Sequence, residues 1–242
     1  MHILPSILLV FALTANAHTH LSNIWVNGTR QAVGRCIRPT TVGSANAPVN
    51  DLASDDLRCR VTNMTPDGTD TCGVVAGTNV TAEWHKSNGM GTVISASHKG
   101  PCLVYMSKME AEGAGNVWFK IHEDGYDPDT DKWCVDKLIA NNGKMEFTIP
   151  VDIEPGNYLM RTEVIALHGA SQQYPPGSTD TYAQLFPNCA QLYVSGKGSA
   201  EPKGVAIPGA YKPTDPGLLV NIHKKLTSYT IPGPDVYEPG SD

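Results

Sequence analysis

The sequence has few charged residues and no excess of basic ones. Lys, Arg, Asp and Glu make up 17% of the 242 residues, and the formal net charge is −6. Such a chain lacks the basic surface that nucleic acid or an anionic membrane requires, so we expect neither as a partner. Apolar runs are short throughout, and none could span a bilayer, so we expect a released protein rather than an anchored one.

Several catalytic motifs are missing as well. The chain contains no GxSxG, no HExxH, no P-loop and no Rossmann fingerprint, the local signatures of common hydrolases, metalloproteases and nucleotide-binding enzymes. The two carboxylates of a glycoside hydrolase lie far apart in a sequence. A hydrolase therefore stays open, but no pattern supports it.

The start of the chain has the pattern of a secretory signal peptide, residues 1–17. The apolar stretch Ile7–Leu13 is followed by Ala15-Asn16-Ala17, a small-x-small cleavage pattern, although no Lys or Arg precedes it. We expect secretion and a mature chain that begins at His18.

Cysteines and glycosylation sequons agree with export. An even number of cysteines in a secreted chain predicts disulfides but leaves their pairing open. The cysteines are Cys36, Cys59, Cys72, Cys102, Cys134 and Cys189. Asn-x-Ser/Thr sequons predict glycosylation at Asn27, Asn63 and Asn79.

Short apolar runs between turn signals predict an all-β fold. Residues 144–149 alternate apolar and polar side chains, which is typical of a half-buried strand. The other runs are Leu21–Val26, Val80–Trp84, Leu103–Met106, Val117–Ile121, Tyr158–Ile165 and Gln191–Val194. We expect an immunoglobulin- or fibronectin-III-like antiparallel β-sandwich with long loops, one of them the Asp-rich stretch 123–136. Residues 18–242 are predicted to form one catalytic domain. Its Pro/Gly-rich C-terminal segment packs across it, and we expect no separate carbohydrate-binding module.

The histidines point to a metal. His18, once it carries a free α-amine, can chelate through that amine and its ring. A second imidazole completes a planar set of three nitrogens, which suits Cu(II) better than the tetrahedral Zn(II). His98, in a polar turn, is the best partner, although a turn histidine is usually just exposed. Its rivals are His85, His122, His168 and His223. His20 offers a different possibility, an amino-terminal x-x-His arrangement that binds copper without catalysis.

Six segments, taken in order, resemble the fungal lytic polysaccharide monooxygenases of auxiliary activity family nine. They are HTHLSNIWVNG, SHKGPCLVYM, NVWFKIHEDG, GNYLMRTEVIALHGAS, AQLFPNCAQLYV and TDPGLLVNIHKKLTSYTIPGP. The resemblance covers nearly the whole mature chain. It implies a monomer that oxidises cellulose or another β-1,4-glucan, with hemicellulose as an alternative, at C1 or C4. The reaction needs one copper ion, O2 or H2O2, and an external electron donor, which is a small molecule or a protein.

The resemblance also implies roles for individual residues. His18 and His98 correspond to the copper ligands, and His168 and Gln184 to side chains that hydrogen-bond the oxidant. The family usually has a tyrosine in the axial direction of the copper, where this chain has Phe186. A non-catalytic copper-binding protein or a metal-free carbohydrate-binding protein on the same fold are the alternatives.

Other residues follow from the same resemblance. Arg161 and Glu163 fit a buried ion pair beneath the site. Cys59 and Cys189 match a disulfide of the family, and the pairing of the other four cysteines stays open. On the substrate face, His223 replaces a frequent tyrosine, which predicts weaker stacking on sugar rings. Further candidates for this face are Tyr211 and Tyr229.

Overall fold

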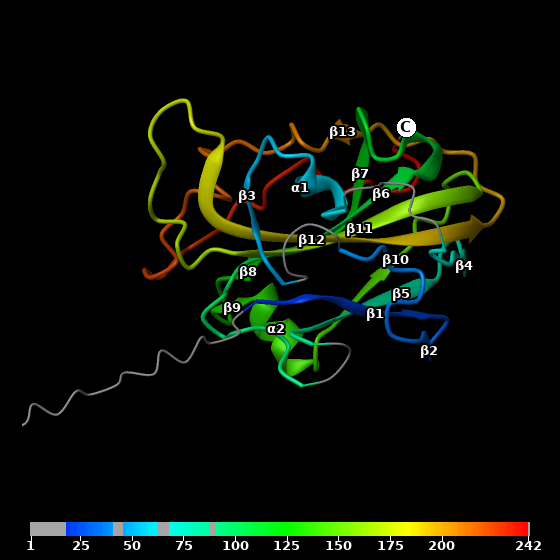
Figure 1. Cartoon of the computed structure of the whole chain (residues 1–242), viewed down its shortest axis with the longest axis horizontal. Coiled ribbons are helices and arrows are strands. Elements are labelled where there is room, and N and C mark those ends of the chain that lie inside the picture. The colour runs from blue at the N-terminus through cyan, green and yellow to red at the C-terminus, as the bar shows by residue number, and fades with distance from the viewer. Residues whose placement is uncertain (1–17, 41–45, 62–67, 88–90, 242) are drawn as a thin grey trace, which may run out of the picture.

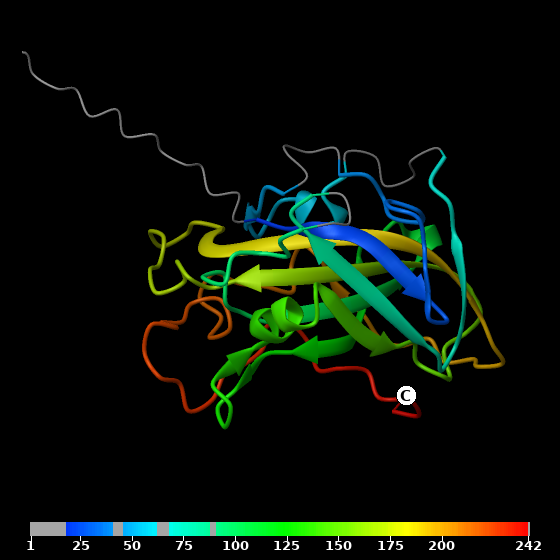
Figure 2. The same cartoon turned by 90° about the horizontal axis from the view of Figure 1, so that it is seen from below.

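The computed structural model describes residues 18–40, 46–61, 68–87 and 91–241. The predicted signal peptide, residues 1–17, and the sequon at Asn63 lie outside these ranges. Two β-sheets pack against each other (Figures 1 and 2), which confirms the predicted β-sandwich. In the described ranges, no helix is long and apolar enough to cross a membrane.

The smaller sheet has four antiparallel strands in the order β10-β5-β1-β2. These strands are β1 (His20–Val26), β2 (Thr29–Arg30), β5 (Asn79–His85) and β10 (Lys144–Thr148). The predicted alternation of β10 is confirmed, because Met145 and Phe147 are buried while Glu146 and Thr148 are exposed.

The larger sheet has the order β13-β7-β6-β11-β12-β3, and β4 pairs in parallel with the end of β12. Its strands are β3 (Val49–Asp51), β4 (Cys72–Val75), β6 (Cys102–Lys108), β7 (Asn116–Asp124), β11 (Gly156–Ala166), β12 (Asp180–Ser195) and β13 (Val205–Ala206). The short helices are α1 (Asp56–Cys59), the 3-10 helix η1 (Met109–Ala111) and α2 (Cys134–Ala140).

Strand β12 is much longer than its predicted part, Gln191–Val194. It pairs with β11 from Gln184 to Val194, but on its other edge it meets β3 before Pro187 and β4 after it. Proline lacks the N–H that a central position requires, so it is tolerated between these two partners. Because proline usually interrupts a strand, the sequence did not predict the part of β12 around it.

The Asp-rich stretch 123–136 is not the single solvated loop that the sequence predicted. It contains a hairpin of β8 (Tyr126–Asp127) and β9 (Lys132–Trp133), followed by the start of α2. Asp127 accepts backbone N–H bonds from Asp129 and Thr130, so an acidic side chain closes the turn. The buried ring of Trp133 then holds the hairpin against the domain.

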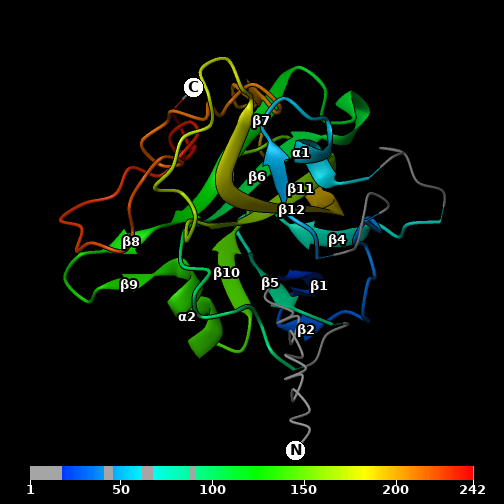
Figure 3. The ribbon, with the colours of Figure 1, turned by 60° about the vertical axis from the view of Figure 1, so that its left-hand side comes forward.

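Buried apolar side chains form two clusters, one on each face of the larger sheet. Ile24, Trp84 and Met160 belong to the cluster between the sheets. Leu57 and Leu218 belong to the second cluster, on the outer face. The C-terminal segment covers part of the larger sheet, as predicted (Figure 3), and a backbone hydrogen bond joins residue 237 to residue 120 of β7.

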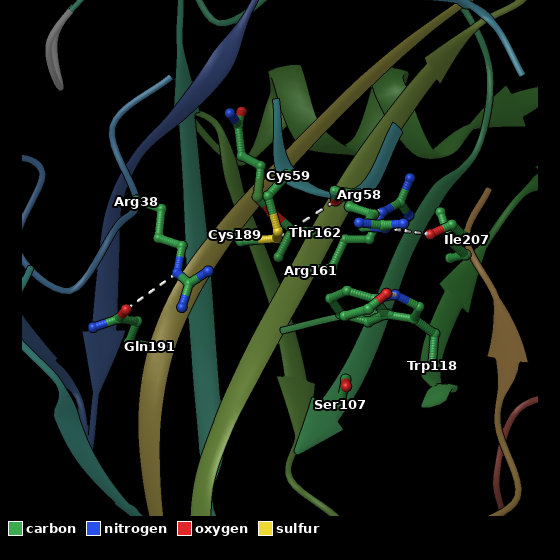
Figure 4. The surroundings of a disulfide bond; sticks show 12 residues. Arg38, Arg58, Cys59, Ser107, Trp118, Arg161, Thr162, Cys189, Gln191 and Ile207 are labelled. Atoms are coloured by element: carbon green, nitrogen blue, oxygen red, sulfur yellow. Dashed lines mark hydrogen bonds between the residues drawn. A yellow bond between two sulfur atoms is a disulfide. The ribbon is translucent and has the colours of Figure 1, made fainter. Parts of the chain in front are cut away.

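An ion pair and a disulfide lie on this outer face. Arg161 and Glu163 are completely buried and 2.5 Å apart, which confirms the predicted buried ion pair. Arg161 also donates to the carbonyl oxygen of Leu57. The predicted Cys59–Cys189 disulfide is present beside Arg161 (Figure 4). The remaining pairs are Cys36–Cys72 and Cys102–Cys134.

Candidate metal centre

Three histidines from distant parts of the chain meet. His18 lies two residues before the first residue of β1, His98 lies in the turn ahead of β6, and His168 follows β11. The ring centroids of His18 and His98 are 5.6 Å apart, and those of His98 and His168 are 4.3 Å apart. The fold therefore brings together three of the histidines that the sequence singled out.

Backbone contacts position the first two of these rings. The N–H of Leu21 donates to Oδ1 of the buried Asn188, 2.9 Å away, which ties the beginning of β1 to β12. The N–H of His98 donates to the carbonyl oxygen of Ser95 at 2.9 Å, and this bond closes the turn. Asn188 was not among the predicted residues, and its place beside Cys189 was its sole signal in the sequence.

The two nitrogens of the His98 ring have different surroundings. Nδ1 lies 3.2 Å from the Ser97 hydroxyl. Nε2 is buried and has no hydrogen-bond partner among the described residues. A buried polar atom without a partner is costly, unless a ligand satisfies it. Since Ser97 can accept a proton held on Nδ1, the lone pair at Nε2 is free for a metal ion.

Burial keeps these imidazoles uncharged. It lowers the pKa of His98 to about 4, and the positive charges that His168, His18 and Lys86 can carry act in the same direction. The pKa of His18 is lowered by burial and by the charge of Arg60. The pKa of His168 is lowered by burial and by the neighbouring His18 and His223. Neutral rings keep their lone pairs at neutral pH, as metal ligands must.

Phe186 and Gln184 complete the surroundings of the rings. The completely buried Phe186 ring lies 5.5 Å from the His18 ring and 6.5 Å from the His98 ring, centroid to centroid. Alternation along β12 puts Gln184 on the same face as Phe186. Oε1 of Gln184 and Nδ1 of His168 are both buried and without partners in the described part of the chain. Each of these two atoms is therefore open to a hydrogen bond with a small polar ligand.

The donor set fits copper. Within the described ranges, no group of three or more His, Cys, Asp or Glu side chains is arranged to hold a metal ion. Two imidazoles therefore need a donor of another kind, and cleavage before His18 would supply an amine nitrogen. A small set of donors that are all nitrogen atoms, two imidazoles and one amine, suits copper in a planar geometry.

The other histidines have different roles. Nδ1 of His20 lies 2.5 Å from Oδ1 of Asn46, and His20 pairs with His85 in the sheet. Because Asn46 already contacts Nδ1 of His20, this nitrogen is not free to complete an x-x-His chelate, which argues against that alternative. Nε2 of His85 bonds Glu83 at 2.9 Å, and His122 packs near Phe147.

The three predicted substrate-face residues differ in exposure. His223 is exposed, and its Nε2 lies 3.0 Å from the carbonyl oxygen of His168. Tyr229 is half-buried, and its hydroxyl donates to the carbonyl oxygen of Gly217. The prediction for Tyr211 is wrong. This ring is 4% exposed and its hydroxyl donates to Glu163, so it cannot stack on a polysaccharide.

Comparison with known families and proteins gives a consistent result. Residues 18–230 match the model of Auxiliary Activity family 9 (formerly GH61). The chain is 43% identical to AA9 family lytic polysaccharide monooxygenase A of Aspergillus niger, over 94% of this chain and 54% of that protein. It therefore spans about half the length of this relative. It is 44% identical to AA9 family lytic polysaccharide monooxygenase E of Botryotinia fuckeliana, over 94% of each chain.

Solved structures agree. The structure of CvAA9A superposes with a TM-score of 0.82 at 35% identity, covering 91% of this chain and 98% of that one. A cellulose-active polysaccharide monooxygenase from M. thermophila superposes with a TM-score of 0.71 at 29% identity, covering 91% and 99%.

Proposed function

The chain belongs to auxiliary activity family 9, and on this premise we propose that it is a copper-dependent lytic polysaccharide monooxygenase acting on β-1,4-glucans. One observation carries the proposal: Nε2 of His98 is buried, without a partner among the described residues, and part of a ring cluster with His18. The similar M. thermophila protein, which is cellulose-active, makes cellulose an expected substrate, and a hemicellulose is the alternative.

The reaction hydroxylates C1 or C4 of a glycosidic linkage. It consumes H2O2 and releases water, or it consumes O2 with two electrons and two protons from an external donor and again releases water. The hydroxylated carbon then expels the neighbouring sugar, which breaks the chain. When bound, copper supplies the one-electron chemistry that activates the oxidant.

The residues of the cluster would hold the metal and orient the oxidant. The amine and ring of His18 and Nε2 of His98 would bind the metal, while Ser97 fixes the proton on Nδ1 of His98. Nδ1 of His168 and Oε1 of Gln184 would hydrogen-bond the oxidant. H2O2 both donates and accepts hydrogen bonds, so it suits a ring nitrogen beside an amide oxygen. A site at the chain terminus can approach a crystalline polymer that could not enter a cleft.

The proposal extends to the form of the protein. We place the activity in residues 18–242 as one secreted, monomeric domain that starts at His18, with glycans on the exposed Asn27 and Asn79. Partners are the polysaccharide and a reductant of small-molecule or protein type.

The test uses protein that begins at His18 and carries one copper. It is incubated with amorphous cellulose, a reductant and a low supply of H2O2, and soluble products are analysed by mass spectrometry. We expect oxidised oligosaccharides that disappear in His98→Ala and persist in His122→Ala, a control outside the cluster. Products unaffected by His98→Ala would contradict the assignment.

A second candidate is a non-catalytic copper-binding protein, and Phe186 favours it because phenylalanine brings no hydroxyl to the cluster. Tight copper binding without oxidised products, on cellulose and on a panel of hemicelluloses, would support this candidate.

A further inference from the structure

A cavity with cationic walls adjoins the histidine cluster. Its volume is about 280 Å³, and its lining includes Lys99, His223, Lys224 and Lys225. Lys99 follows His98 in the chain, and Nε2 of His223 lies 3.0 Å from the carbonyl oxygen of His168. The cavity and the histidine cluster are therefore joined by one turn of the chain and by one contact between side chain and backbone.

The charges in the cavity are unbalanced. Three lysines face a single carboxylate, Asp131, which already accepts a hydrogen bond from the Tyr126 hydroxyl at 2.7 Å. Nζ of Lys99 lies 3.9 Å from Asp136, a long ion pair. Lys224 and Lys225 are exposed, and in the described part of the chain no carboxylate lies within 4.0 Å of either. The protein as a whole carries a net charge of −6, so the excess of positive charge in this cavity is opposite in sign to the net charge.

The volume of the cavity and the chemistry of its walls limit which class of ligand it can bind. The volume is just below the ~300 Å³ at which pockets for drug-sized ligands begin, so it suits one sugar unit rather than an oligosaccharide. Tyr126, Ile222 and Leu226 give the cavity apolar wall, against which the C–H face of a pyranose can pack. Lysines beside such a wall complement a sugar that carries a carboxylate.

We infer that this cavity binds a hexuronic acid residue, carried as a side branch by a polysaccharide whose main chain lies over the histidine cluster. The inference rests on the proposed function, because that function puts a polysaccharide main chain there. It makes Lys224 and Lys225 specificity residues: among branched hemicelluloses, they favour an acidic branch over a neutral one. Attraction between exposed charges is screened by salt, so the preference for the acidic branch falls as ionic strength rises.

The test measures binding alone, on copper-free protein with a chelator present, so it does not depend on turnover. The probe is a xylo-oligosaccharide with one glucuronic acid branch, and its control is the same compound after reduction of the carboxyl group to the alcohol. The variant Lys224→Gln/Lys225→Gln is compared with Lys197→Gln/Lys203→Gln. The second pair removes the same charge from a cavity beyond the far end of β12.

We expect the wild type to bind the acidic probe roughly fivefold or more tightly than the reduced one, as one or two exposed ion pairs permit. Lys224→Gln/Lys225→Gln should abolish this preference, and Lys197→Gln/Lys203→Gln should retain it. Equal affinity for the two probes overturns the inference, and so does an equal loss in both double variants. Tighter binding of a cello-oligosaccharide that ends in an aldonic acid would also overturn it, since an oxidised chain end would then be the ligand. If oxidised products form from cellulose while the acidic preference is missing, the inference fails and the proposed function stands.

Discussion

The rings of His18 and Phe186 lie 5.5 Å apart, centroid to centroid, and are tilted by 46° to each other. Phe186 is fully buried and comes from β12, whereas His18 precedes β1 in the other sheet. The contact thus joins the two sheets beside the proposed copper ligand. A tyrosine at this position would bring a phenol to the cluster.

We expect Phe186→Tyr to slow the inactivation of the enzyme during turnover. A phenol can give up a hydrogen atom to a stray oxidant before the histidine ligands are damaged. The measurement is the decay of product formation with time under H2O2 and reductant. Phe119→Tyr adds a phenol at another buried phenylalanine and should leave the rate of inactivation unchanged. An inactivation rate that Phe186→Tyr leaves unaltered would count against this role.

His223→Tyr should strengthen binding to crystalline cellulose. A tyrosine offers a larger aromatic face to a sugar ring than histidine does, and His223 is exposed beside His168. A cellulose pull-down at constant salt measures the bound fraction. Tyr193→His, which removes an exposed tyrosine near the far end of β12, is expected to leave that fraction unchanged. If His223→Tyr binds no better than the wild type, His223 is not on the substrate face.

Glu163→Gln should destabilise the fold without weakening copper binding. The substitution leaves Arg161 charged and completely buried, a situation that typically costs about 3–5 kcal/mol in the free energy of unfolding. Glu154→Gln breaks a partly exposed ion pair with Lys108 and should cost much less. Denaturant titration at neutral pH compares the two variants. A loss of copper affinity in folded Glu163→Gln would show that the pair acts on the metal site as well.

The carboxyl group of Glu83 should make the stability of the fold depend on pH. Burial alone would raise its pKa, but hydrogen bonds from Arg30, Trp25 and His85 outweigh this and hold the pKa at about 2, below the ordinary value of 4.5. A carboxyl with a depressed pKa stabilises the folded state above its unfolded pKa. That contribution is lost as the pH falls from about 4.5 to about 2.

The loss due to Glu83 should amount to at most about 3.5 kcal/mol, because the pKa is lowered from 4.5 to about 2 and each pKa unit corresponds to about 1.4 kcal/mol. The free energy of unfolding of copper-free protein, measured across this pH range, should fall less steeply in Glu83→Gln. Glu146→Gln, an exposed position in the same sheet, should follow the wild type. Parallel pH profiles for wild type and Glu83→Gln would contradict the prediction.

Local patterns in the sequence predicted much of the fold but not all of it. Alternation identified β10, which buries one face, and a strand-like run between turn signals identified most of β11, which is buried on both faces. Most of β12 was not predicted because it contains Pro187. Whether a strand tolerates a proline depends on which strands lie beside it, and the sequence does not show this. Helix α2 has only seven residues and begins at a disulfide cysteine, Cys134, so it carries too little periodicity to be recognised.

The site could be predicted in part for a similar reason. His18, His98 and His168 lie in recognisable segments, so family resemblance was enough to select them. Asn188 carried no signal, because its role depends on the distance between β1 and β12. Tyr211 was misplaced since its burial depends on Tyr105 and Glu163, which a reading of neighbouring residues cannot locate.

The central claim is that the amine of His18, together with Nε2 of His98, makes the chain terminus a copper site. The most direct test compares protein that begins at His18 with the same protein carrying one extra glycine ahead of it. The extension keeps both imidazoles but displaces the amine from His18. We predict that copper affinity, measured against a competing chelator, falls by at least an order of magnitude on extension, and that oxidised oligosaccharides disappear. Equal copper affinity and equal product yield from the two proteins would contradict the account.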